Sequence, residues 1–195
     1  EPFESPTSWL SRMALNQGVT VWEVLAYLKI NIDGDDDLDI EFAVKVDEKV
    51  AQVCGLPLSS FSFMKHMFSQ LRTIDANGSI FLLYYRKSAR YRFCGRCLSE
   101  QQTSHLPVHW RFKAWRWCPL HNCLLNDRCP HCKSVLKMPK NLMDAGPQSK
   151  GVAYLSRCTT CDKSLTSKSR KTRFSERERS LKLIDHLLLS NGRAL

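Results

Sequence analysis

Over about the first third of the chain, apolar residues recur every three or four positions, which is the period of an amphipathic α-helix. The pattern predicts a helix over residues 8–16, with Thr7 or Ser8 as its N-cap and Gly18 after its end. A second helix is predicted over residues 20–29. Their apolar sides are Leu10, Met13 and Ala14 in the first helix and Val21, Val24, Leu25 and Leu28 in the second. Two short helices joined across a glycine are typical of a helix-turn-helix-like unit.

An acidic stretch, residues 31–39, follows this pair of helices. Its alternating aspartates resemble a calcium loop, but an EF-hand requires glycine at its sixth position and glutamate at its twelfth, where this chain has Leu38 and Val44. The calcium interpretation therefore fails. We expect an acidic loop that leads into the next helix.

The helix, glycine, helix pattern recurs over residues 47–68. Gly55 separates the two predicted helices, and Ser59 or Ser60 is placed to cap the second one. Cys54 lies on the apolar side and has no second cysteine at metal-ligand spacing, so we expect it to pack in the core. The stretch is a second unit of the helix-turn-helix type.

The pattern is less decisive after this second unit. Asn77-Gly78 predicts a turn, and the apolar run from Ile80 to Tyr85 fits either a short strand or a buried helical turn. A loop or short hairpin is expected over residues 137–151, which hold two prolines and two glycines. A C-terminal helix is predicted over residues 175–190.

Length and composition limit the class of protein. The chain has 195 residues, and 43% of them are hydrophobic, which suffices for one compact domain or two small ones. It contains no run of about 18 apolar residues, and its first 30 residues lack the basic start and apolar centre of a signal peptide. We therefore expect no membrane association and a cytoplasmic location.

Charge divides the chain unevenly. The net charge is +10, but residues 1–60 hold 4 Lys or Arg against 11 Asp or Glu, whereas the remainder holds 25 against 8. A strongly basic region suits a polyanion such as nucleic acid, because its cations neutralise phosphates. The acidic region suits a basic protein surface, and the alternative is that its charges are only solvated.

Six of the chain's nine cysteines lie within residues 92–136, and seven of the nine belong to CxxC or CxxH units. Two residues between ligands let both side chains point at one tetrahedral ion, and two such units complete its shell. The odd number of cysteines and the lack of an export signal favour zinc over disulfide bonds. The four units are Cys94-x-x-Cys97, Cys118-x-x-His121, Cys129-x-x-Cys132 and Cys158-x-x-Cys161.

Pairing the units in chain order gives two zinc sites with four protein ligands each. Because no coordination position stays open, both ions are expected to be structural. Two alternatives remain open: the first unit pairs with the third, or Cys123 replaces His121 as a ligand. The sequence lacks the motifs of zinc deaminases, P-loop proteins, serine hydrolases and zinc proteases, so we expect no enzyme activity.

Arginine, lysine and tryptophan are interleaved around the first cysteines. Cations neutralise phosphates and flat rings stack on bases, so this composition indicates nucleic-acid binding. Tryptophans near a zinc ligand also fill its small core; we expect that role for Trp110 and Trp117, while Trp115 fits either role. The candidate phosphate-binding residues are Arg86, Lys87, Arg90, Arg92, Arg96, Arg111, Lys113 and Arg116, with a second group of Lys168, Arg170, Lys171 and Arg173. The second group fits a solvated linker equally well.

Together these patterns predict a mainly α-helical protein with small zinc-bound knuckle or ribbon modules. The expected regions are a helix-turn-helix-like region over residues 1–85, two tandem zinc-binding motifs over residues 86–165, and a basic linker with a C-terminal helix over residues 166–195.

Three stretches carry a resemblance to a known family: "ESPTSWLSRMALNQG" near the start, "DEKVAQVCGLPLSSFSFM" in the middle, and the segment from Tyr91 to Leu136. The last contains, in order, Cys-x-x-Cys, Trp, Cys-Pro-x-His and Cys-Pro-x-Cys, which is its most specific part. Over roughly residues 1–165 the chain resembles TniQ, the target-selection family of certain bacterial transposons, including CRISPR-associated ones.

The resemblance implies a non-catalytic adaptor with an N-terminal helix-turn-helix region and tandem zinc-binding motifs. Such an adaptor connects a target-recognition complex to an AAA+ ATPase regulator, which recruits the transposase. In some members the recognition complex is a CRISPR effector with its guide RNA. The family's metal positions fall on the eight ligands of the four units above. Double-stranded DNA is a further expected partner, and a homodimer stays open.

The alternative function is an autonomous, zinc-dependent helix-turn-helix regulator of transcription that reads DNA sequence itself. A recognition helix in a major groove normally lies among phosphate-binding cations. Residues 1–60 contain only four, Arg12, Lys29, Lys45 and Lys49. The charge of this region therefore argues against the alternative.

Overall fold

The structure is a computed structural model that describes residues 1, 3–34, 36–86, 88–137 and 155–166, together with Ser175 and Ser180. Most of the predicted hairpin over residues 137–151 and of the predicted helix over residues 175–190 lies outside the described residues. Among the described helices, none is long and apolar enough to span a membrane.

The first predicted helix is present as α1 (Pro6–Gln17). Its N-cap is Ser5, whose hydroxyl accepts a hydrogen bond from the N–H of Ser8 at 3.2 Å. The predicted cap at Thr7 or Ser8 is wrong, because the helix begins earlier with a proline, which fits the first helical position without an N–H to satisfy. Gly18 ends α1 as predicted, with a left-handed φ of 67°.

The second helix, α2 (Val21–Tyr27), begins at a capping box. The N–H of Thr20 donates to the Glu23 carboxylate at 2.7 Å, and the N–H of Glu23 donates to the Thr20 hydroxyl at 3.1 Å. The acidic stretch then leads into a helix, as expected. Asp37 caps this helix, α3 (Leu38–Lys45), by accepting backbone N–H groups of its first turn.

The second pair of helices is also present, as α4 (Glu48–Val53) and α5 (Ser62–Ile74). The predicted cap at Ser59 or Ser60 is wrong, because both serines lie in a 3₁₀ helix, η1 (Leu58–Phe61), that runs directly into α5. Both helix, glycine, helix patterns thus form helices. Their helix-turn-helix geometry stays a prediction.

Apolar packing stabilises the helical region. Phe42 of α3 is fully buried, and the rings of Trp9 and Phe61 lie 5.6 and 5.8 Å from its ring, centroid to centroid. α5 presents one apolar face to α3, with buried positions at helical spacing. These positions are Met64, Met67, Phe68 and Leu71.

The turn predicted at Asn77-Gly78 is confirmed. Gly78 has a left-handed φ of 65°, which favours glycine, and a Cβ atom there would lie 2.8 Å from a methyl carbon of Ile40 and 2.9 Å from one of Leu82, so these side chains would have to shift. The apolar run that follows is a strand only at its end, β1 (Tyr84–Tyr85).

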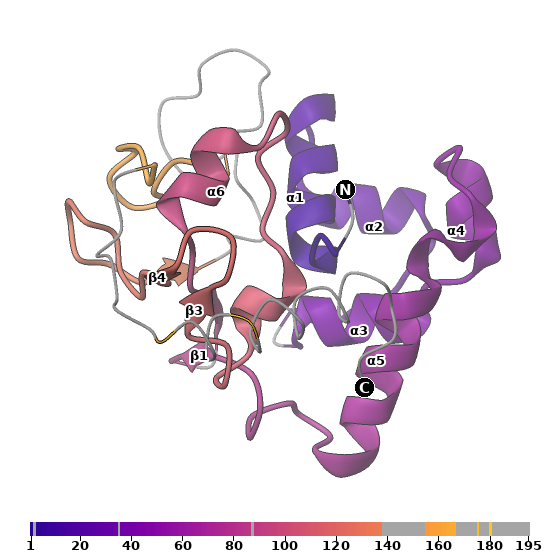
Figure 1. Ribbon diagram of the computed structural model, residues 1–195. Helices are drawn as coiled ribbons and strands as arrows, with labels where there is room; N and C mark the ends of the chain where they lie inside the picture. The colour runs from indigo at the N-terminus through magenta and orange to yellow at the C-terminus, as the bar shows by residue number, and fades with distance from the viewer. Residues whose placement is uncertain are drawn as a thin grey trace.

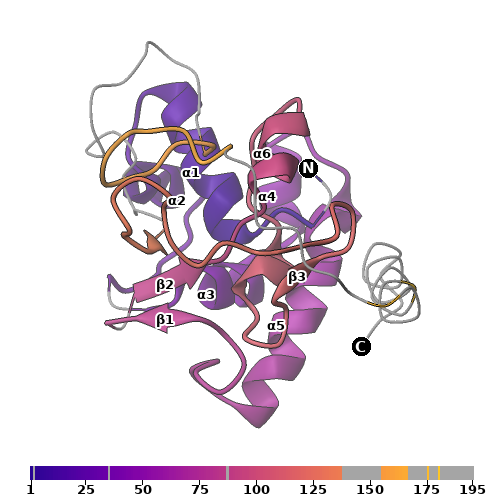
Figure 2. The ribbon, with the colours of Figure 1, turned by 60° about the vertical axis from the view of Figure 1, so that its left-hand side comes forward.

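The cysteine-rich side contains very short elements. β1 pairs antiparallel with β2 (Ser88–Tyr91), and β2 pairs antiparallel with β5 (Leu136–Lys137), with Arg90 opposite Lys137. Figure 2 shows β1 and β2 side by side in this sheet. The remaining elements are α6 (Gly95–Glu100), the 3₁₀ helix η2 (Val108–Arg111), and the hairpin strands β3 (Trp117–Cys118) and β4 (Cys123–Leu124).

In Figure 1 the helices α1 to α5 lie on one side, and α6 with the cysteine-rich segments lies on the other. The two sides share their cores. Leu15 of α1 belongs to the buried cluster of the cysteine-rich side, and Val108 packs in the cluster around α5. Contacts therefore cross the predicted boundary after residue 85, and the boundary itself stays a prediction.

Candidate metal centres

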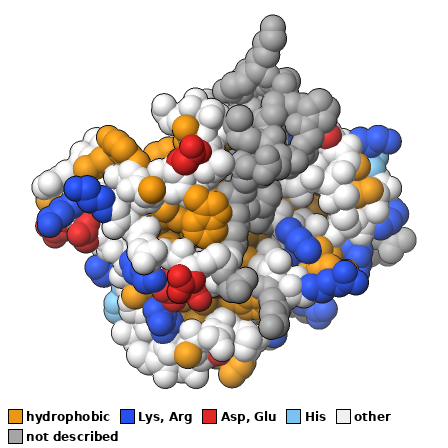
Figure 3. Space-filling view, turned by 180° about the vertical axis from the view of Figure 1, so that it is seen from behind, with side chains coloured by type: hydrophobic (Ala, Val, Ile, Leu, Met, Phe, Trp, Pro, Cys, Tyr) orange, Lys and Arg blue, Asp and Glu red, His pale blue; other side chains and the backbone are white. Residues whose placement is uncertain are grey.

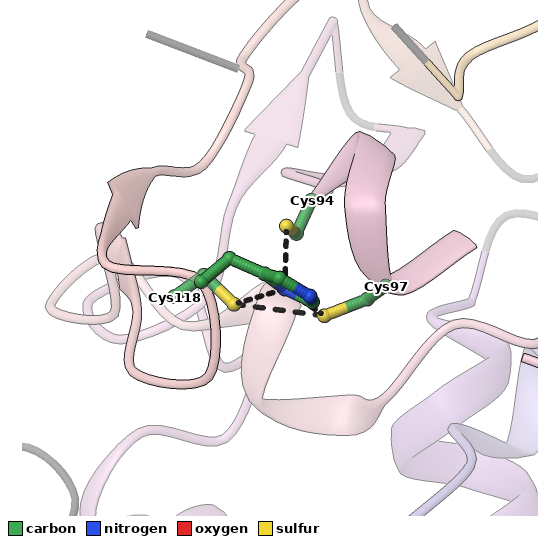
Figure 4. Close-up of side chains that lie close together, drawn as sticks. Cys94, Cys97 and Cys118 are labelled. Carbon is green, nitrogen blue, oxygen red and sulfur yellow. Dashed lines mark hydrogen bonds between the residues drawn. The ribbon is translucent and has the colours of Figure 1, made fainter. Parts of the chain in front are cut away.

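The first candidate centre forms between α6 and the β3–β4 hairpin. Cys94 directly precedes α6, and Cys97 lies in its first turn. Cys118 ends β3, and His121 lies in the turn that connects β3 to β4. Figure 4 shows the sulfur atoms of the three cysteines pointing toward one another. A helix start and a hairpin turn thus bring together two ligand pairs that are separate in the chain.

Distances in this first centre match those around a tetrahedral zinc ion. The Nδ1 atom of His121 lies 3.3–3.5 Å from each of the three sulfur atoms. The sulfur atoms of Cys97 and Cys118 are 3.5 Å apart. Bonds of about 2.0–2.3 Å to one tetrahedral ion place ligand atoms roughly 3.5–3.8 Å apart. Spacing and donor type therefore both fit a metal ion.

His121 is oriented by a carboxylate on its far side. With Nδ1 facing the sulfur atoms, the other ring nitrogen, Nε2, lies 2.9 Å from the carboxylate of Glu100, the last residue of α6. A carboxylate in this position fixes the ring and increases the basicity of the ligating nitrogen. Glu100 is therefore part of the centre although it is not a ligand.

The three thiols of the first centre influence one another's ionisation. Hydrogen bonds with Cys118 and Cys97 lower the pKa of Cys94, and hydrogen bonds with Cys118 and Cys94 raise the pKa of Cys97. The pKa of Cys118 is raised to about 12, chiefly by its hydrogen bond with Cys94. One thiolate is thus stabilised by two thiols. A divalent cation favours loss of the remaining protons, because a metal ligand is a thiolate.

The second candidate centre joins two knuckles that are far apart in the chain. The sulfur atoms of Cys129 and Cys161 are 3.8 Å apart, and those of Cys132 and Cys158 are 3.6 Å apart. All four sulfur atoms lie within 4.8 Å of one another. Four zinc–sulfur bonds of about 2.3 Å require separations of roughly 3.8 Å, so this centre fits an ion as well.

Both knuckles of the second centre use the same backbone turn. Lys133 and Asp162, each directly after the second cysteine of its unit, have left-handed φ values of 62° and 53°. Within each knuckle, the N–H of the residue two places after the first cysteine donates to that cysteine's sulfur atom at 3.4 Å. Such N–H groups stabilise a thiolate ligand. The knuckles are therefore shaped for charged sulfur atoms.

The structure brings the ligands together as pairing in chain order predicts, and not in the interleaved arrangement. Cys123 is buried, with its sulfur atom 3.8 Å from that of Cys94, but the compact set of ligand atoms contains His121 instead. Each group can hold one metal ion. Four side-chain ligands fill a tetrahedral shell, which suits a structural ion.

Arg111 lies in the interior, so its assignment to nucleic-acid binding is corrected. Its side chain is fully buried, and its guanidinium forms ion pairs with Asp37, at 2.8 Å, and with Asp39. The hydroxyl of Tyr84 donates to Asp37 at 2.6 Å, and that of Tyr91 donates to Asp39. The rings of both tyrosines lie about the guanidinium, with centroids 5.3 and 5.5 Å from its central carbon. We call these five residues the Arg111 cluster.

The Arg111 cluster connects α3 to the cysteine-rich side. Burial alone raises the pKa of Asp37, but the charge and hydrogen bonds of Arg111 outweigh it, so the pKa is lowered. Burial also raises the pKa of Tyr84 and of Tyr91, so both hydroxyls keep the proton that they donate. Sequence reasoning missed this cluster, because no periodic pattern pairs Arg111 with an aspartate 74 positions earlier.

Arg92 is the second correction. Only 6% of its surface is exposed, and its guanidinium donates to three backbone carbonyls within residues 112–115. Asp127 accepts from both Arg90 and Arg92, at 3.1 and 3.0 Å. Arg92 therefore connects backbone segments and is closed to a phosphate.

The other candidates around the first centre remain at the surface. Arg86, Lys113 and Arg116 are exposed, and Arg96 is partly exposed. Their contact with nucleic acid stays a prediction. The candidates outside the described residues are Lys87, Lys168, Arg170, Lys171 and Arg173.

The three tryptophans of the cysteine-rich side pack in or against its core. Trp110 and Trp117 are buried, as predicted. Trp115 is partly buried, packs against the same buried cluster, and lies with its ring 4.9 Å from that of His109. Cys54 is partly buried against the core of the helical region, which agrees with its predicted packing role.

Fold and centres together define a mainly helical protein with two cysteine-rich clusters that can each hold a metal ion. The TniQ family model matches residues 1–125, and the chain belongs to the TniQ family. It is therefore a transposition-associated protein, of a family whose members are generally non-catalytic components. No curated protein matches the chain.

Proposed function

We propose that the chain is a non-catalytic adaptor for target selection in DNA transposition. It links a target-recognition complex to an AAA+ ATPase regulator, and through the ATPase to the transposase. An RNA-guided CRISPR effector is one form of this recognition complex. The observation that carries the proposal is the TniQ match over residues 1–125, because these residues include both the helical region and the first metal centre.

The proposal includes one Zn²⁺ ion in each centre. Three thiolates with one imidazole, and four thiolates, are ligand sets typical of structural zinc. The strands beside the centres are two to four residues long, which is too short for independent stability. The ions therefore supply folding free energy to this side of the molecule.

In the proposed adaptor the helical region binds protein. Its acidic charge, 11 acidic against 4 basic residues over residues 1–60, is complementary to a basic partner surface. Several of its apolar side chains are exposed, as at protein interfaces. They include Trp22, Tyr27, Val53 and Leu58.

A pull-down with the purified, zinc-loaded full chain tests the adaptor role. The bait is the chain, and the prey is the AAA+ ATPase regulator that the adaptor is proposed to bind, with and without double-stranded DNA. Retention of the ATPase is expected. No retention, together with tight binding to one defined DNA sequence, would contradict the adaptor and favour the autonomous regulator.

A matched pair of surface variants locates the interface. Tyr27 on the helical side is 74% exposed, and Leu124 on the cysteine-rich side is 43% exposed. Tyr27→Ala is expected to reduce ATPase retention, whereas Leu124→Ala is expected to leave it unchanged. The reverse outcome would move the protein-binding surface to the cysteine-rich side.

A further inference from the structure

We infer that the surface around the second metal centre binds the sugar-phosphate backbone of double-stranded DNA. The cations that form it differ from those that the sequence singled out, apart from Arg86 at its edge. They are Arg128, Lys133, Lys137 and Lys163, and with Arg86 we call them the basic surface. The inference deepens the proposed function, on which it rests for the choice of DNA as partner.

The basic surface carries charge that acidic residues do not neutralise. Residues 128–137 and 155–166 hold five Lys or Arg and a single acidic residue, Asp162. Both carboxylate oxygens of Asp162 accept from Arg157, at 2.8 Å each. Among the described residues, the other four cations of these segments form no ion pair. Their charge is therefore open to a polyanion.

On the helical side three of the six cations are paired with acidic residues, whereas Lys29, Lys49 and Lys65 form no ion pair among the described residues. Arg12 pairs with Glu4 at 2.7 Å, and both Lys45 and Arg72 pair with Glu41, at 3.0 and 3.2 Å. Figure 3 shows the same contrast on the back of the molecule. Lys and Arg side chains over the helices lie beside acidic ones, whereas those over the cysteine-rich side, at the right, mostly do not.

Local contacts hold four of these five cations in place without neutralising them. The guanidinium of Arg128 donates to the Lys133 carbonyl at 3.0 Å, and the ammonium of Lys133 donates to the carbonyl three residues earlier at 2.7 Å. The Lys137 ammonium and the Arg86 guanidinium lie 4.9 and 5.5 Å from the ring centre of Tyr85. Side chains ordered beforehand lose less conformational entropy when they bind a phosphate.

The second metal centre places the two segments of the basic surface next to each other. Its four cysteines hold residues 128–137 against residues 155–166. The hydroxyl of Thr159 also donates to the Lys137 carbonyl at 3.5 Å. Charges that are distant in sequence thus lie on neighbouring, fixed segments.

The chemistry of the basic surface indicates contact with the sugar-phosphate backbone of DNA and no recognition of base edges. Lysine ammonium groups and an arginine held at a turn bind phosphate oxygens as charges, and such contacts carry no sequence information. Tyr85 is occupied by two cations and is not free to stack on a base. We therefore expect sequence-independent, strongly salt-dependent binding.

The test compares a triple variant with the wild-type full chain. Arg128→Gln, Lys133→Gln and Lys163→Gln together remove three exposed positive charges. Binding of a fluorescent 30-base-pair DNA duplex is measured by anisotropy over a series of NaCl concentrations. Each phosphate contact contributes about 0.9 to the slope of log affinity against log salt, so the slope is expected to fall by about 2.7 and the affinity in 0.1 M salt by at least about tenfold.

The matched control removes the same charge from the helical side, by Lys29→Gln, Lys45→Gln and Lys49→Gln, all exposed positions. Its slope is expected to equal that of the wild type. Equal slopes for the two triple variants would overturn the inference, because net charge alone would then explain binding. A double-stranded RNA of the same length serves as the second probe. If the Arg128, Lys133 and Lys163 variant loses binding to the RNA but keeps the wild-type affinity for the DNA, the choice of DNA as partner is contradicted.

A measurement without mutation keeps the inference testable even if the triple variant misfolds. Wild-type chain is acylated with a limiting amine-reactive ester, with and without the DNA duplex, and modified lysines are quantified by mass spectrometry. Protection of Lys133 and Lys163 but not of Lys29 and Lys49 is expected. Equal protection of all four would overturn the inference. The pull-down is repeated with the triple variant. Retention of the ATPase without a change in DNA binding would overturn this inference alone, whereas loss of ATPase retention by the wild type would count against the adaptor proposal.

Discussion

The helical side and the cysteine-rich side of the molecule are stabilised by different forces. In the helical side, capped helices bury apolar faces, as Phe42 and Phe68 do at 0% exposure. In the cysteine-rich side, most strands have two residues and five of the buried core residues are cysteines. Such strands are too short to be stable without another constraint. Apolar packing and helix caps therefore specify the first side, whereas ligand geometry specifies the second.

The largest effect is expected when one ligand of the first centre is removed. Cys118→Ser should lose at least one of the two zinc equivalents and unfold the cysteine-rich side, because structural zinc contributes on the order of 10 kcal/mol to small metal-binding domains. Zinc content by a chromogenic chelator and near-ultraviolet circular dichroism check this. The control is Cys54→Ser, whose cysteine lies outside both centres. A Cys118→Ser variant that keeps two zinc ions would rule out this centre.

The next largest effect concerns the Arg111 cluster, which joins the two sides. Arg111→Met leaves two buried carboxylates, Asp37 and Asp39, without their cation, so it should cost about 3–5 kcal/mol of unfolding free energy. Lys113→Met, at an exposed position nearby, is the control and should change stability by less than about 0.5 kcal/mol. Chemical denaturation measures both. Equal stability of the two variants would show that the cluster does not connect the sides.

The pH dependence of this cluster follows from its pKa shift. Because the pKa of Asp37 is lowered in the folded protein, the stability that it contributes is fully present above its unfolded pKa, about 4. That stability is lost as the pH falls through the lowered pKa that Asp37 has in the folded protein. The free-energy difference between wild type and Arg111→Met should therefore shrink as the medium is made more acidic than about pH 4.

A smaller effect is expected at Glu100, which orients His121 without binding the ion. Glu100→Gln should weaken zinc affinity of the first centre by about 10- to 100-fold, as removal of an orienting carboxylate does in other sites. Competition with a chelator of known affinity measures it. The second centre is an internal control, since its ligands are four cysteines. Equal weakening at both centres would argue against an orienting role.

The smallest effect is expected on the helical side. Thr20→Ala removes one half of the capping box of α2 and should cost about 1 kcal/mol of unfolding free energy without any change in zinc content. Thermal denaturation with zinc analysis checks both. A loss of zinc in this variant would mean that the two sides are stabilised as one unit.

Sequence patterns predicted the helices of one side and the metal centres of the other, and they missed one helix cap. Helix positions followed from apolar spacing and from glycine, as at Gly18, because local rules decide them. Both metal centres followed from the spacing of cysteines, since two intervening residues fix the geometry of a ligand pair. The cap at Ser5 was missed, because a proline moved the start of α1 toward the N-terminus.

Charge was harder to place than metal ligands. Arg92 and Arg111 look like surface cations in the sequence, yet tertiary contacts bury both. Asp37 and Asp39 appear there as part of a solvated acidic loop, and they become the partners of Arg111. Such pairs depend on contacts between distant segments, which no local period reports. The positions of these charges therefore required the structure.

Hydrogen–deuterium exchange of the full chain, before and after zinc removal by a chelator, tests most directly whether metal stabilises the cysteine-rich side and packing stabilises the helical side. We predict that amides over residues 88–137 and 155–166 lose most of their protection, whereas those of α1, α2 and α5 retain theirs. Amides near Asp37, where the Arg111 cluster joins the two sides, should lose an intermediate share of their protection. Unchanged exchange throughout, or simultaneous loss of protection in all helices, would contradict the claim that metal stabilises one side and packing the other.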